Sequence, residues 1–195
     1  MTREEVLAKL AAGEAITGQA LLRIDLAGAD LRGARLLGCQ MQWANLAGAN
    51  LEGADFEGSL LNEAVLRGAR LAGAGLVRVD AHNITLAEAV LTGARLEKAD
   101  FRDGDLSHAR FDGANLSAAV LRGAKLDHAD LTGARLDGAD LNRATLGGAR
   151  LAGASFAGAN CFLADFRGAE VAGASFAGAK LFLAKFDAGI SPDAG

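Results

Sequence analysis

The sequence predicts an all-β fold: a four-sided solenoid with 20 residues per coil and a short N-terminal capping helix. The first observation is a strict five-residue period from Leu21 to Phe186, in which 30 of the 34 positions hold Leu or Phe. The second is a column two residues earlier, from position 24 to 184, which holds Ala in 27 of 33 cases. No insertion interrupts either column, so a stack of equal units is expected.

A five-residue period is incompatible with a long helix or a long flat strand. In a helix, positions five apart are rotated by about 140°, which would spread the apolar residues around all sides. In a strand, positions five apart point to opposite faces. The Ala and the Leu or Phe of one unit are two residues apart, so they share one side of a short extended segment. Each unit is therefore predicted to be a short strand piece followed by a corner.

The corner column predicts the length of one coil. The residue two places after each Leu or Phe is Gly at 19 of the 33 positions from 23 to 183, and Gly suits a turn with positive φ. Among the 14 exceptions, a series with a 20-residue spacing stands out. Its members are Arg23, Trp43, Glu63, Asn83, Asp103, Arg143, Leu163 and Leu183. Four units per coil and a ladder spacing of about 4.8 Å predict a rod on the order of 40 Å long.

The units themselves resemble a known family. The segments ADLRG at 29–33, ANLEG at 49–53 and ADL at 139–141 are similar to the consensus A-(D/N)-L-x-x of the pentapeptide-repeat family. The resemblance covers roughly residues 21–188 and implies a right-handed quadrilateral β-helix. It also implies two functional expectations. Studied members protect DNA gyrase and are similar to a DNA duplex in size and charge, and related proteins often dimerise at the C-terminal end.

The two ends of the chain differ from the repeats. Residues 2–5 (TREE) form a capping box, and Val6, Leu7 and Leu10 follow on one helical face, so we expect a helix at 2–11 over the first coil. A membrane-surface helix is the alternative, but the segment is short and not basic. The chain is divided into an N-terminal helix and linker at 1–20, a β-helix at 21–188 and a tail at 189–195. The tail is short and rich in Gly, so an open C-terminal end is expected.

Composition favours one soluble, cytoplasmic domain. The chain has 195 residues, 51% of them hydrophobic, and a net charge of −4. No run approaches the roughly 18 apolar residues of a membrane span, and no signal peptide is evident. Lys and Arg are spread over all sides and balanced by acidic residues, so neither direct nucleic-acid binding nor membrane binding is expected.

No motif of catalysis, cofactor binding or metal binding is evident, and we expect none of these functions. Cys39 and Cys161 occupy core columns, and no phosphate-binding loop occurs. Glu88, His108 and His128 occupy equivalent corners of consecutive coils, about 4.8 Å apart, where side chains could reach one metal ion. A fourth ligand is not identifiable, so solvated surface residues are the preferred interpretation.

One side of the solenoid is the candidate interface. Sides 1 to 4 are numbered by their first Leu-column residues, at 21, 26, 31 and 36. Side 1 carries outward apolar residues of the kind found in interfaces. The candidate interface residues are Trp43, Phe162, Leu163, Phe182, Leu183 and Phe186. Two alternatives remain: side 1 uses a turn type without Gly, or Trp43 packs against the N-terminal helix.

The sequence favours a non-catalytic protein-binding or scaffold module with an unknown protein partner, and a homodimer through its C-terminal coils. The first alternative is a DNA-mimic protector of DNA gyrase. Such a mimic needs dense negative charge, and no side of this chain is strongly acidic. The second alternative is an accessory protein of a bacterial secretion or toxin system, because residues 2–14 are similar to segments that precede the repeats in such proteins.

Overall fold

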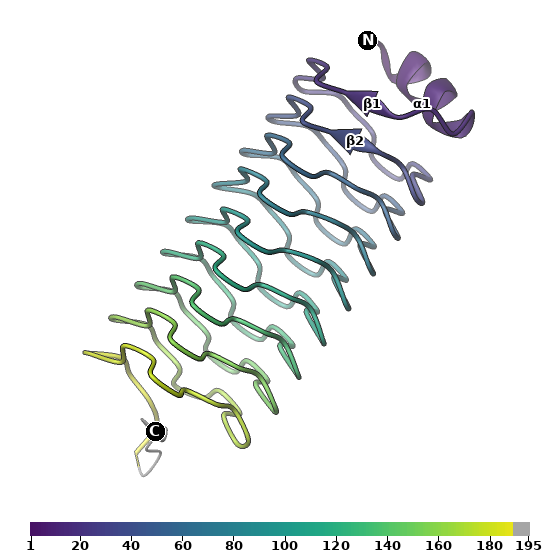
Figure 1. Ribbon diagram of the computed structural model, residues 1–195. Coiled ribbons are helices and arrows are strands. Elements are labelled where there is room, and N and C mark those ends of the chain that lie inside the picture. Colours follow the sequence, from purple (N-terminus) through teal and green to yellow (C-terminus); the bar gives the residue numbers. More distant parts are fainter. Residues whose placement is uncertain (189–195) are drawn as a thin grey trace.

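The computed structural model describes residues 1–188, which wind into a rod of stacked coils with one helix at the N-terminal end (Figure 1). Helix α1 spans Arg3–Ala11, and strand β1 (Ile16–Thr17) pairs in parallel with β2 (Leu36–Leu37). Single parallel bridges then continue from Ala20–Gln40 to Asp165–Lys185, always between residues 20 apart. Each coil is thus joined to the next through four short ladders. The expected tail at 189–195, and with it the open C-terminal end, lies outside the described residues.

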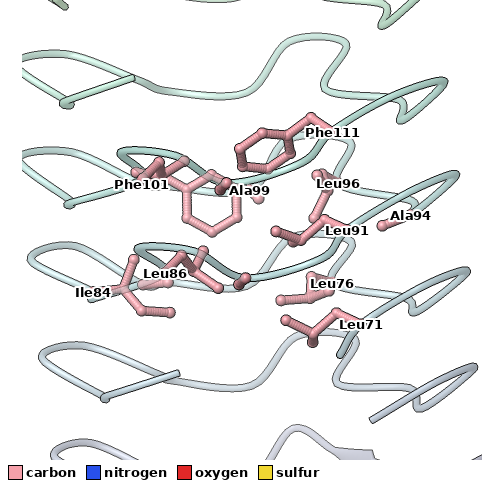
Figure 2. Packing of buried hydrophobic residues seen from close by; sticks show 14 of the residues in the cluster. Leu71, Leu76, Ile84, Leu86, Leu91, Ala94, Leu96, Ala99, Phe101 and Phe111 are labelled. Atoms are coloured by element: carbon pink, nitrogen blue, oxygen red, sulfur yellow. The ribbon is translucent and has the colours of Figure 1, made fainter. Parts of the chain in front are cut away.

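The two apolar columns form the core of the rod. From Leu21 to Ala169 every residue of the Leu/Phe column and of the Ala column is buried. Figure 2 shows Leu71, Leu91 and Phe111 above one another, each from a successive coil. Burying one such side chain contributes about 1.5–3 kcal/mol relative to leaving it exposed. The hydrophobic core is therefore a continuous column along the rod and has no single central cluster.

Where Asp or Asn precedes the Leu or Phe of a unit, its side chain stabilises the corner. The side-chain oxygen of Asp100 accepts a hydrogen bond from the Arg102 N–H at 3.1 Å, and Asn115 and Ser117 repeat this geometry at 3.1 Å. Asp and Asn stabilise turns because their short side chains reach a backbone N–H two residues on. An Asp or Asn at the second position of the repeat is therefore a turn-forming residue.

Side chains of unusual size in the core are compensated one coil away. In the Leu/Phe column of side 1 Ala81 precedes Phe101, while in the Ala column of side 2 Ile84 precedes Gly104. A Cβ atom on Gly104 would lie only 3.2 Å from Ile84 Cγ2, so Ile84 already fills that space. Figure 2 shows Ile84 and Phe101 in these neighbouring coils. Close packing makes residues 20 apart depend on one another.

Ser59 is the one polar side chain among the buried residues of the described chain. Its hydroxyl accepts a hydrogen bond from the Cys39 N–H at 2.9 Å and donates one to the Leu36 carbonyl at 2.7 Å. In other turns the equivalent N–H and carbonyl bond directly, as between Ala54 and Leu51 at 3.0 Å. The Ser59 hydroxyl therefore bridges one opened turn and leaves no buried group unpaired.

Helix α1 is capped at its start. The Thr2 hydroxyl accepts a hydrogen bond from the Glu5 N–H at 3.3 Å, and the Glu5 carboxylate accepts one from the Thr2 N–H at 2.9 Å. Val6 is fully buried, and Leu7 and Leu10 pack against the core of the first coil. Across residues 1–188, no helix has both the length and the apolar character required to cross a membrane.

All four sides use the same left-handed corner. The 14 corner residues that are not Gly have φ between 55° and 63°, and the corner glycines have φ between 59° and 79°. Side 1 therefore has no special turn type, and the alternative that its corners do not need Gly is wrong. A non-Gly residue in this conformation costs about 1–2 kcal/mol. Each such residue on side 1 is kept despite local strain.

Ala118→Gly is expected to stabilise the fold, because Ala118 has φ 57°. Relief of about 1–2 kcal/mol of strain exceeds the roughly 0.4–1 kcal/mol lost to a more flexible unfolded chain, so the free energy of unfolding should rise by up to about 1 kcal/mol. Urea denaturation measures the difference. The matched control is Ala119→Gly, in the buried column, which should destabilise. A loss of stability in both variants would contradict this account of the corners.

Candidate protein interface

Four apolar side chains form a contiguous surface on side 1 of the last two coils. This C-terminal cluster consists of Phe162, Leu163, Phe182 and Leu183. The rings of Phe162 and Phe182 stack with centroids 5.9 Å apart and planes at 13°. Phe182 is 71% exposed and Leu183 is 56% exposed, while the two residues of the earlier coil are half-buried. An exposed group of this size and composition is typical of a protein-binding surface.

The backbone makes these residues costly to keep. Leu163 and Leu183 both occupy left-handed corners, with φ 59°, where a bulky aliphatic residue is rare. Their side chains contribute no buried core volume at these outward positions, since the core is filled by the two inward columns. Strain without a matching gain in core packing is better explained by an external contact than by stability.

Phe186 does not belong to this cluster. It lies in the Leu/Phe column of side 2, where its ring stacks on Phe166 with centroids 4.8 Å apart and planes at 1°. It also meets the ring of Phe176 edge-on at 5.7 Å. These rings form an aromatic core at the C-terminal coils, and Phe186 is itself partly buried. Phe186 therefore extends the aromatic core into the last described coil.

Trp43 lies on the same side but far from the C-terminal cluster. Its side chain is 45% exposed, and the guanidinium carbon of Arg23 lies 5.2 Å from the ring centroid. The aromatic ring is therefore paired with a cation from the preceding coil. Six coils separate Trp43 from Leu163, about 29 Å at ladder spacing. The structure does not bring the two parts of the predicted interface together.

The three residues weighed as metal ligands do not converge. The rings of His108 and His128 stack with centroids 5.0 Å apart, while Glu88 pairs with Arg67 at 2.5 Å. Within residues 1–188 no group of three or more His, Cys, Asp or Glu side chains is placed to hold a metal ion. Burial raises the pKa of the Cys161 thiol to about 12, so it carries no thiolate at neutral pH.

The charged surface is a mosaic of paired residues. Asp30, Asp100 and Asp165 each pair with the Arg two positions on, at 2.7, 2.6 and 2.5 Å. Hydrogen bonds from Arg167 lower the pKa of Asp165 to about 2. Other pairs bridge neighbouring coils, among them Arg70 with Glu52 at 2.5 Å and Arg150 with Asp130 at 2.8 Å. About half of the acidic residues on the described surface thus pair with a nearby Arg, while others, such as Asp55 and Asp103, have no ion-pair partner among the described residues.

A groove beside helix α1 was not expected from the sequence. It encloses about 670 Å³ between the helix and the edge of the first coil. Its walls combine Leu7 and Leu10 of the helix with Leu31 of side 3. The amphipathic pattern of the helix indicated that one face is apolar. The groove itself depends on the position of the helix over the first coil, which the sequence pattern does not specify.

The repeat geometry described above is that of a known family. A model described as "Pentapeptide repeats" matches overlapping segments from residue 17 to residue 181. The chain therefore belongs to the pentapeptide-repeat family, which confirms the resemblance seen in its units.

Two solved structures show the same fold. HetL, from the cyanobacterium Nostoc sp. strain PCC 7120, is 32% identical, with a TM-score of 0.51 over 100% of this chain and 99% of its own. It is described as a pentapeptide repeat protein involved in heterocyst differentiation regulation. QnrB1, a plasmid-mediated fluoroquinolone resistance protein, is 23% identical, with a TM-score of 0.51 over 89% of both chains. No curated protein matches this chain.

Arg23→Ala is expected to shift the fluorescence of Trp43, the single Trp of the chain, to longer wavelength. Removing the guanidinium 5.2 Å from the ring exposes one indole face to water. Acrylamide quenching should rise in parallel. The control is Arg143→Ala, at the equivalent corner six coils from Arg23, which should leave the emission unchanged. Unchanged emission in Arg23→Ala would show that the pair does not persist in solution.

Proposed function

We propose that this protein is a non-catalytic protein-binding module, in which a rigid β-helix presents an apolar surface to another protein. The single observation that carries the proposal is the C-terminal cluster on side 1, built at strained corners. In this proposal residues 1–20 form the N-terminal cap and linker, and residues 21–188 form the right-handed quadrilateral β-helix. The expected cytoplasmic location stays a prediction.

The proposed partner of the C-terminal cluster is a second copy of the chain. Complete burial of four large apolar side chains contributes about 1.5–3 kcal/mol each, before the cost of association is subtracted. Phe162 and Leu163 are already half-buried, so the larger share comes from Phe182 and Leu183. A two-fold axis through the cluster would bury it on both copies and close the assembly without forming fibres.

HetL adds support of a different kind. Its description names a regulatory process, and its identity to this chain extends over the whole length. Involvement in regulation agrees with a module that offers binding surfaces to other proteins. The accessory role in a secretion or toxin system rests on the similarity of residues 2–14 alone and stays an alternative.

The double change Phe162→Glu and Phe182→Glu is expected to convert a dimer into a monomer with an intact fold. Charges at the centre of an apolar contact would have to lose their hydration without a partner. Sedimentation velocity at tens of micromolar protein measures the mass, and circular dichroism checks the fold. Leu22→Glu, at an exposed residue of side 1 near the other end, is the matched control and should stay dimeric. An unmodified protein that sediments as a monomer would refute self-association.

Protection of DNA gyrase is the second candidate, favoured only by the fold shared with QnrB1. A DNA duplex carries one negative charge per about 1.7 Å of axis, and a mimic has to reproduce that density. In this chain the carboxylates of Asp100, Asp130 and Asp165 are instead paired with Arg residues. The electrostatic surface of the rod is therefore a poor imitation of DNA.

We accordingly expect no protection of gyrase from a quinolone. A supercoiling assay with purified gyrase, a quinolone and stoichiometric protein measures this directly, with QnrB1 as the positive control. Recovery of supercoiling at low micromolar concentration would show that charge density is not required and would make gyrase the leading partner.

A further inference from the structure

We draw no further inference here: the strongest candidate, the recess at the Gly123 corner of side 1 lined by Arg102, Asp103, Arg122, Asn142 and Arg143, is a mixed-charge surface in which Arg102 and Arg122 already pair with Asp100 and Asp140, and nothing in the structure shows what covers it.

Discussion

The stacking of each residue on its counterpart 20 positions away is the constraint on which the whole structure depends. Parallel bridges join such pairs on all four sides, and the same register places core side chains directly above one another. Large residues stack either on a small neighbour in the next coil, as Phe101 does on Ala81, or on another large one, as Phe186 does on Phe166. The fold is therefore determined by local agreement between adjacent coils, and no central core organises it.

This constraint separates positions that serve the fold from positions that are free. The inward columns and the Asp or Asn before them are occupied by packing and by turn formation. The corners are conformationally demanding, since all of them adopt a positive φ, and Gly satisfies that demand without strain. Bulky residues such as Leu163 and Leu183 at these corners oppose the preference of the backbone. The side of the rod on which strained residues gather is accordingly where binding is expected.

The two ends of the rod pose a different problem, because a ladder of stacked coils always has an edge. At the N-terminal edge the chain uses three treatments: a short strand on side 4, an arginine on side 2 and an uncovered groove beside the helix on side 3. About half of the acidic residues along the body pair with Arg residues within or between coils, which weakens the negative field of the rod. The candidate binding surface is therefore the apolar C-terminal cluster on side 1.

The sequence by itself determined the family, the inward columns and the position of the capping box at Thr2–Glu5. It did so because the five-residue period and the local caps depend only on neighbouring residues. The tertiary structure alone decided that side 1 shares the left-handed corner of the other sides, that Arg23 covers Trp43, and that Phe186 stacks within the core. It also decided that the backbone carbonyls of Asp30 and Arg32, beside α1, have no hydrogen-bond partner among the described residues. These features arise from contacts between residues about 20 positions apart, and no local pattern in the chain specifies their geometry.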